Sequence, residues 1–556
     1  MALPRDEYNA LEDIVGPENI SEEPAVIDSY AFQFQTEMER VDQSHWNPRA
    51  EAVLTPGSAE EIQAIVRTCN KYKTKVKAHS TGWGAWTTVN DVNCILLDLR
   101  RMNRILEIDE QNMLAVVEPY VVGAQLQPEL MKRGLNTHMV GAGASCAPLA
   151  TCTSWVGPGP DSLFMGASSQ NLLACEWVTP TGDIVRTGSW GSGAGFFCGE
   201  GPGPSVRSII RGELGGAGGL GVFTKCAIKV SPWPGPPELP IEGSAPCYTI
   251  PPLETIRVHT AAFPNWEAYA ESCYRITRAE IAYVAHRQFN QWGVALWPAI
   301  LRLYTDKTKH LDDLEELLEM PEIQKLAEES KHSYQIILAG NTPTDLEYKE
   351  KVLDKILADL GGWKLAAMEE PVERDLSLAW MAKLSYKSAN FLFGTFVGVA
   401  TPFGTPDFVV KTTEPIVSVK RQFMGIGPES ITDEGGDAFM AALTYAGGQT
   451  IIAWEPFIFY DSADPASVKG INDFIDAMLA FSGGKGWGHA HVRHFGASGL
   501  TDAERQALLH KGESLEAKDT QGLEVPTVEP LRWQWKIKQA MDPNDIGDFS
   551  YFVMKD

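Results

Sequence analysis

Four side chains that could carry out acid–base or anion chemistry lie within six positions of one another in the stretch HAHVRH: His489, His491, Arg493 and His494. If this stretch is a strand, its alternation places His489, His491 and Arg493 on one face. An arginine there can pair with a carboxylate or a phenolate, and a histidine can act as a base near neutral pH. The types and spacing therefore predict a site that holds an anion or moves a proton, with His491, Arg493 and His494 as catalytic residues.

The same cluster has two further interpretations. His489 and His491 could hold a divalent metal ion, because two imidazoles on one face of a strand can ligate the same ion. Alternatively, the histidines make ordinary hydrogen bonds and do no chemistry. The residues alone leave these alternatives open.

Three glycine-rich segments form a second group of candidate residues. They are KAHSTGWGAW (77–86), VGAGASCAPLATCTSWVGPGP (140–160) and RGELGGAGGLGVFTKCAIKV (211–230), and β-type runs border each of them. Glycine lets successive backbone N–H groups converge on a phosphate, although the first segment alone is more typical of a plain turn. Together, the three segments favour one long, phosphate-bearing cofactor, a dinucleotide.

The third segment matches G-x-G-x-x-G between Gly216 and Gly221. This match does not predict a Rossmann site, because that fingerprint requires a helix after the glycines. Here the strand-like run GVFTKCAIKV follows instead. The cofactor is therefore expected in a different kind of fold.

The elements that must position these loops are short strands and amphipathic helices. Ser58 and Glu61 form a capping-box pattern, and the apolar residues that follow recur at helical spacing. Lys75–Ala78 is strand-like, as are CILLDL, ILEID and LAVVEPY, and GAQLQPELMKRG is helix-like. The run CEWVTPTGDIVRTG predicts two strands joined by a turn at Gly182. The pattern predicts an α+β fold.

Composition excludes several classes of protein. The 556 residues carry a formal net charge of −25, which disfavours a nucleic-acid ligand. No apolar run reaches the roughly 18 residues of a membrane span, and the N-terminus lacks a signal-peptide pattern, so we expect a cytoplasmic protein. The nine cysteines include no C-x-x-C pair, so no iron–sulfur or structural zinc site is predicted.

AVLTPGSAEEIQAIVRTCNKYKTKVKAHSTGWGAW resembles the opening of the FAD-binding domain of the vanillyl-alcohol oxidase/p-cresol methylhydroxylase (PCMH) family. The resemblance continues through NCILLDLRRMNRILEIDEQNMLAVVEPYVVGAQL, where Tyr120 replaces the usual glycine, and at the far end in KGWGHAHVRHFGA and KIKQAMDPNDIGDF. It implies an N-terminal arm (1–44), a two-part PCMH-type FAD-binding domain (45–235) and a substrate or cap domain with a mixed or antiparallel sheet (236–484). A C-terminal segment (485–556) would return to the flavin site.

The resemblance also implies a role for each glycine-rich loop. The first would hold the FAD pyrophosphate, the second would line the flavin, and the third would touch the ribityl or adenosine part. The implied residues are, in that order, Ser80, Thr81, Gly82, Trp83 and Gly84; Gly141, Gly143, Ala144 and Ser145; and Gly216, Gly218, Gly219, Gly221 and Val222.

This sequence departs from the family pattern in two places. The stretch NFLFGTFVGVATPFG contains neither the His nor the Tyr through which family members tether FAD, so we expect non-covalent FAD. GWGHAHVRHF lacks the Tyr-Arg pair beside which related enzymes activate phenols. A vanillyl-alcohol-like substrate is therefore not implied.

The expected function is an FAD-dependent oxidoreductase that transfers a hydride from a small hydroxylated or aromatic substrate to flavin N5. Electrons would then pass to a protein acceptor or to oxygen. One alternative is a metal-assisted 2-hydroxy-acid dehydrogenase, similar to the glycolate and D-lactate enzymes. Another is an FAD-binding electron-transfer or scaffold subunit of a larger complex. A redox protein partner or a homo-oligomer is expected.

Overall fold

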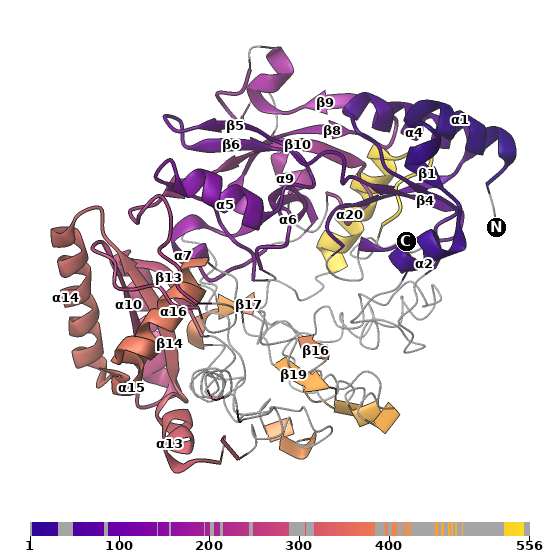
Figure 1. Cartoon of the computed structure of the whole chain (residues 1–556). Helices are drawn as coiled ribbons and strands as arrows, with labels where there is room; N and C mark the ends of the chain where they lie inside the picture. The colour runs from indigo at the N-terminus through magenta and orange to yellow at the C-terminus, as the bar shows by residue number, and fades with distance from the viewer. Residues whose placement is uncertain are drawn as a thin grey trace.

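The fold is described from a computed structural model of the chain. It describes residues 3–31, 48–82, 87–89, 91–141, 143–154, 157–193, 195–200, 205–211, 215–243, 248–287, 319–383 and 528–549, with short pieces between 306 and 317 and between 395 and 481. Figure 1 shows the indigo and purple N-terminal part above a rose and orange part that forms its own sheet-and-helix layer. The yellow C-terminal helix lies against the N-terminal part.

The first sheet has the strand order β1-β2-β4-β3. Its strands are β1 (Ile20–Ser21), β2 (Val53–Leu54), β4 (Cys94–Asp98) and β3 (Lys75–His79). β4 pairs in parallel with both β2 and β3, while β1 is antiparallel to β2. Helices α1 (Arg5–Val15) and α4 (Ala59–Tyr72) cover it and share one apolar core with its strands (Figure 1).

Helix α4 forms as its sequence predicts. Ser58 Oγ accepts a hydrogen bond from Glu61 N at 3.1 Å, and Ile62, Ile65 and Cys69 are buried on the inner face. The reciprocal half of the capping box is shifted by one residue, because the Glu61 carboxylate accepts from Gly57 N rather than from Ser58 N.

The second sheet is antiparallel throughout, with the order β5-β6-β10-β8-β9. Its strands are β5 (Ile105–Asp109), β6 (Leu114–Val117), β10 (Val222–Lys229), β8 (Leu172–Val178) and β9 (Ile184–Arg186). Helices α5 (Gly123–Met131), α6 (Pro148–Ser154) and α9 (Arg207–Ile210) lie along its lower face in Figure 1. The predicted strands, the helix and the turn at Gly182 are confirmed, and β10 directly follows the Gly216–Gly221 turn.

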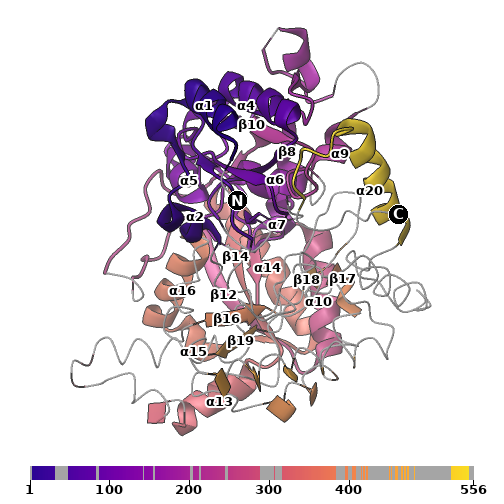
Figure 2. The ribbon, with the colours of Figure 1, turned by 90° about the vertical axis from the view of Figure 1, so that its right-hand side faces the viewer.

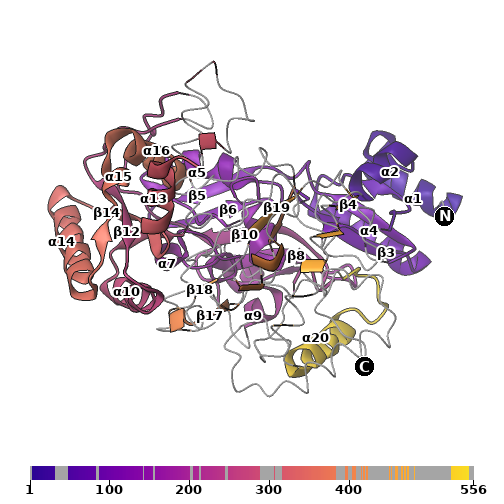
Figure 3. The ribbon, with the colours of Figure 1, turned by 90° about the horizontal axis from the view of Figure 1, so that it is seen from below.

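The third sheet belongs to the cap and has the antiparallel order β13-β14-β12-β15. Its strands are β12 (Ile256–Ala262), β13 (Ala282–His286), β14 (Ser333–Ala339) and β15 (Trp363–Lys364). Ala261 packs with α10 (Trp266–Ala279) and α14 (Pro343–Leu360), whereas Ala262 packs with α13 (Pro321–Glu329) and α15 (Ala366–Glu369) on the other face. The view from below separates these two helical layers (Figure 3).

The C-terminal helix α20 (Val528–Met541) connects the two sheets of the N-terminal part. Ile537 and Met541 pack against the core of the second sheet, and the chain then turns so that Gly547 pairs in parallel with Val76 of β3. Figure 2 shows α20 beside α9.

Short elements complete the described chain. They are η1 (Pro17–Asn19), α2 (Pro24–Ala31), β7 (Leu135–Asn136), α7 (Ser162–Met165), α8 (Ser168–Asn171), η3 (Gly188–Ser192), β11 (Ser231–Pro232), α16 (Pro371–Lys383), β16 (Thr395–Gly398), β17 (Phe403–Gly404), η7 (Arg421–Phe423), β18 (Ile452–Ala453) and β19 (Phe457–Tyr460).

Candidate functional site

The Gly216–Gly221 turn faces a narrow crevice of about 10 Å³ between the first and second sheets. Five separate parts of the chain line it. Its walls are Val66 of α4; Val76 and Ala78 of β3; Pro180; Gly216, Gly219, Gly221 and Val222; and Ile546, Gly547 and Asp548. The structure thus brings four of the five residues expected near the adenosine part to one crevice, and Gly218 is buried in the same turn.

The glycines of this turn allow backbone to pack on backbone. Gly219 has φ +68°, and a Cβ there would lie 2.8 Å from the carbonyl oxygen of Gly547. Gly221 has φ +114°, and its Cβ would lie 2.3 Å from the carbonyl oxygen of Val178. No side chain fits at either position, because both the dihedral angle and the contact require glycine.

The C-terminal segment adds a short strand to the edge of the first sheet. Val76 N donates to Ile546 O at 2.7 Å, and Asp548 N donates to Val76 O at 3.0 Å. These bonds bring residues 546–548 between β3 and the Gly216–Gly221 turn. The family resemblance implies that this segment returns to the flavin site, but no sequence motif singles out a residue within it.

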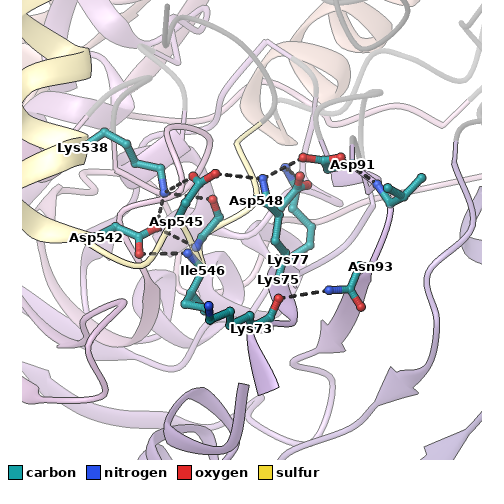
Figure 4. A network of polar contacts seen from close by, with 12 residues as sticks. Lys73, Lys75, Lys77, Asp91, Asn93, Lys538, Asp542, Asp545, Ile546 and Asp548 are labelled. Atoms are coloured by element: carbon teal, nitrogen blue, oxygen red, sulfur yellow. Dashed lines mark hydrogen bonds and ion pairs between the residues drawn. The ribbon is translucent and has the colours of Figure 1, made fainter. Parts of the chain in front are cut away.

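A buried lysine holds the turn before this strand in place (Figure 4). Lys538 is 1% exposed, and its ammonium donates to the Asp542 carboxylate and, at 2.9 Å, to Gly547 O. The two oxygens of Asp542 accept from Ile546 N at 2.9 Å and from Gly547 N at 2.7 Å. Burial lowers the pKa of Lys538, and the Asp542 charge opposes that shift.

A second buried ion pair borders the crevice itself. Lys77 Nζ lies 3.6 Å from Asp548 Oδ2, and both side chains are almost fully buried (Figure 4). Burial lowers the pKa of Lys77, and the Asp548 carboxylate opposes that shift. A buried carboxylate in the crevice wall can accept a hydrogen bond from an N–H or O–H group of a ligand.

The Ser80–Gly82 loop follows β3 directly. Ser80 Oγ donates to Pro119 O at 2.7 Å, and Gly82 adopts φ +74° above the ring of His79. His79 Nδ1 donates to Thr87 O at 3.1 Å, and burial lowers the pKa of its ring. Trp83 and Gly84, the other residues expected in this loop, lie outside the described residues.

A larger cavity of about 600 Å³ lies beside the same loop. Since side chains alternate along a strand, His79 lines this cavity while Ala78 lines the crevice on the other face of β3. Arg100 is held there by the buried Asp98, at 2.8 Å from its Nε, and by the Tyr30 hydroxyl at 2.7 Å. Tyr120, the residue that replaces the usual glycine, also lines this cavity.

The Gly141–Ser145 loop turns through Gly143, which has φ +103°. Gly143 N donates to Val140 O at 2.8 Å, and Ala144 O accepts from Ala124 N at 2.8 Å. A Cβ on Gly143 would meet no atom of the described residues within 4 Å, so the dihedral angle is what favours glycine there. Ala144 is buried and Ser145 is exposed.

The candidate catalytic residues His491, Arg493 and His494 lie outside the described residues, as does His489 of the metal alternative. The described part of the chain holds no cluster of metal-ligating side chains. Within the same residues, no helix has the length and apolar character needed to cross a membrane.

Comparison with known proteins identifies the domain to which this crevice belongs. Residues 50–188 match the family model described as an FAD binding domain. Glycolate oxidase subunit GlcD of Bacillus subtilis is 24% identical over 281 residues, which make up 50% of this chain and 52% of that protein. The chain therefore spans about half the length of this curated relative.

Solved structures show the same fold over nearly the whole chain. A substrate-bound crystal structure of p-cresol methylhydroxylase gives a TM-score of 0.69 at 16% identity, with 100% of this chain and 98% of that chain covered. The isoeugenol complex of 4-ethylphenol oxidase from Gulosibacter chungangensis gives 0.68 at 18% identity, with 99% and 97% covered. The predicted α+β, PCMH-type architecture is confirmed, and residues 50–188 form an FAD-binding domain.

Proposed function

We propose that the protein is an FAD-dependent oxidoreductase that takes a hydride from a small hydroxylated or aromatic substrate. The observation that carries this proposal is the FAD-binding domain of residues 50–188, beside which the Gly216–Gly221 turn lines a crevice between the two sheets. Bound FAD would supply a ring that accepts a hydride at N5 and passes electrons to a protein acceptor or to oxygen.

We place the adenine end of the cofactor beside this crevice. At about 10 Å³ the crevice has room for about one water molecule, so Val66, Val76 and Ala78 would have to move apart to admit a purine ring. The Asp548 carboxylate would accept a hydrogen bond from an amine or hydroxyl group of the adenosine part. The Gly216–Gly221 turn lets the backbone approach the ligand closely, because no Cβ intervenes.

The remaining binding roles stay as the sequence predicts them. N–H groups of the Ser80–Gly84 loop would hold the pyrophosphate, and the Gly141–Ser145 loop would line the flavin. His491 or His494 would take a proton from the substrate, and Arg493 would pair with its developing negative charge. These residues would bind FAD and orient the substrate.

An absorption spectrum before and after acid precipitation tests the cofactor and its attachment. A yellow supernatant is expected, because FAD held without a covalent bond dissociates when the protein unfolds. A yellow pellet would contradict non-covalent binding, and a colourless protein that takes up no FAD would contradict the proposed function.

Anaerobic bleaching of the bound flavin then identifies the substrate class. We expect bleaching by members of a panel of alcohols and phenols, with the rate reduced at least about tenfold in Arg493→Met, because the developing negative charge loses its partner. Equal bleaching rates in wild type and Arg493→Met would contradict a role for Arg493 in the reaction.

A 2-hydroxy-acid dehydrogenase is the second candidate, and the match to a glycolate oxidase subunit favours it. In this alternative, His489 and His491 would ligate a divalent ion. Metal analysis of the purified holoenzyme should then find about one ion per chain. The His489→Asn variant should lose both this ion and the bleaching of its flavin by glycolate or D-lactate. Because that relative is a subunit, a flavin that bleaches only with a redox partner present would instead favour an electron-transfer role.

A further inference from the structure

His138 lies buried between two loops near the second glycine-rich segment. Its Nδ1 lies 2.5 Å from Asp161 Oδ1, and its Nε2 lies 2.8 Å from Gly157 O. His138 is 7% exposed and Asp161 is fully buried. Both ring nitrogens therefore face an oxygen in a site that excludes water.

The partners of the ring decide where its protons lie. A carbonyl oxygen only accepts, so the bond to Gly157 requires a proton on Nε2. Nδ1 and Asp161 Oδ1 lie 2.5 Å apart, and at that distance a proton must lie between them, because two lone pairs would repel each other. The second Asp161 oxygen accepts from Met139 N at 2.8 Å, so both oxygens of the carboxyl group are used in this contact region.

The pair joins two loops that also touch directly. Gly141 N donates to Pro158 O at 2.7 Å. A Cβ on Gly159 would lie 1.8 Å from Met139 O, so the backbones of the two loops are in contact. The Gly141–Ser145 loop, which is expected to line the flavin, is thus braced from behind by residues 157–161.

The same brace continues into the cap. Ala285 N of β13 donates to Pro160 O at 2.9 Å, one residue before Asp161. The rings of Phe164 and Tyr283 lie 4.8 Å apart, and the Tyr283 hydroxyl accepts from Asn136 Nδ2 at 3.2 Å. A shift of Asp161 would therefore change the positions of both the Gly141–Ser145 loop and the cap strand β13.

We propose that His138 and Asp161 form a proton-sharing clamp that positions the Gly141–Ser145 loop against the flavin and links that position to the cap strand β13. The proposal rests on the proposed FAD site. Both are positioning residues, since they act through the loop and not on substrate. Lys229 and Tyr283 are titratable groups that also sense the Asp161 charge.

Two substitutions at Asp161 distinguish the effect of its two hydrogen bonds from the effect of the proton that it shares with His138. In Asp161→Asn, the amide oxygen can still accept from Met139 N, and the amide nitrogen can donate to a neutral His138 ring. Asp161→Ala removes both bonds. We expect the Kd for FAD to stay within about threefold in Asp161→Asn and to rise at least about tenfold in Asp161→Ala, with a changed visible circular dichroism of the bound flavin.

The same logic applies at His138. His138→Gln keeps two N–H donors on one side chain, whereas His138→Leu keeps none. Gln should restore most of the FAD affinity that Leu loses. In apo wild type, a strongly downfield imidazole proton resonance should report the shared proton, and it should be absent in Asp161→Asn and His138→Gln.

His259 provides a matched control. It is also a buried histidine that contacts carboxylates, Glu369 at 3.1 Å and Glu350 at 3.3 Å, but it lies in the cap sheet. His259→Leu should lower thermal stability while leaving both the FAD affinity and the flavin dichroism unchanged. Loss of FAD affinity in His259→Leu equal to that in His138→Leu would mean that only general stability is measured.

The clamp is overturned if Asp161→Ala and His138→Leu fold and bind FAD like wild type, or if Asp161→Asn loses as much affinity as Asp161→Ala. If the Ala and Leu variants do not fold, the Asn and Gln variants and the downfield resonance still decide, because absence of that resonance from wild type contradicts proton sharing. A wild-type protein that binds no FAD but shows the resonance would contradict the proposed function and the loop's role toward the flavin, while the shared proton itself would be confirmed.

Discussion

The Gly216–Gly221 turn and the Ser80–Gly82 loop are both glycine-rich, yet their glycines serve different purposes. In the turn, Gly219 packs against the backbone of Gly547, which comes from the far end of the chain. In the loop, a Cβ added to Gly82 would meet, among the described residues, the ring of His79 at 3.0 Å, and Gly82 also has a positive φ of +74°. The conformation of the Gly216–Gly221 turn therefore depends on packing against a distant segment, whereas that of the Ser80–Gly82 loop depends on its own dihedral angles.

The largest effect should come from removing the cation that holds the distant segment. Lys538→Met leaves Asp542 buried without its ion-pair partner, which should lower the free energy of unfolding by about 3–5 kcal/mol. Denaturant unfolding of the two proteins measures this loss. FAD affinity should fall with it, since residues 546–548 line the crevice.

Lys75→Met is the matched control. Lys75 pairs with Asp91 at 2.7 Å and with Asp545 at 3.2 Å, and both of these partners are only partly buried, whereas Asp542 is fully buried. Its removal should cost less than about 1 kcal/mol. Equal losses in the two lysine variants would show that burial of the Lys538 pair does not matter.

Gly547→Ala attacks the same contact sterically. Its Cβ would lie 2.0 Å from Gly219 O, so the segment and the turn must move apart at a cost of about 3 kcal/mol. FAD titration should show weaker binding than in wild type. An unchanged affinity for FAD would contradict the placement of the cofactor beside the crevice.

Gly82→Ala should have a smaller effect, of about 1–2 kcal/mol, because it meets a positive φ and the edge of one ring. Gly361→Ala, at the end of α14, has φ +67° and open space, so it isolates the cost of the dihedral angle. Pyrophosphate competition with FAD measures the loop's role. A binding loss only in Gly82→Ala is expected.

The smallest effect concerns pH. Burial lowers the pKa of His79, so below about pH 6.5 the unfolded chain takes up a proton that the folded chain does not. Stability should therefore fall as the pH falls, by up to about 1.4 kcal/mol per pH unit from this group. In His79→Gln the urea midpoint should depend less on pH. Identical pH dependence of the urea midpoint in wild type and His79→Gln would show that His79 is not the group that takes up the proton on unfolding.

Local patterns were sufficient to predict much of the N-terminal fold. Ile62, Ile65 and Cys69 recur at helical spacing and line the inner face of α4. The strand-like run after Gly221 excluded a Rossmann site, and β10 begins at Val222. These predictions succeeded because periodicity and turn chemistry act between near neighbours.

The contacts that complete the crevice could not be predicted in this way. Val76 pairs with Gly547, and Lys77 faces Asp548, across most of the length of the chain. A lysine in a strand is ordinarily exposed, and only the folded packing shows that Lys77 is buried. His138 and Asp161 are closer in sequence, but no motif marks their shared hydrogen bond.

The pairing of Val76 with Gly547 also sets an order on biosynthesis. Residues 50–188 leave the ribosome long before residues 542–548 are made. Until then, the edge of β3 is unpaired with Gly547, and the crevice lacks the wall that residues 546–548 form. If the crevice binds FAD as proposed, complete binding requires the C-terminal segment and so follows synthesis of the whole chain. Until then, the edge of β3 is a surface that needs protection from wrong partners.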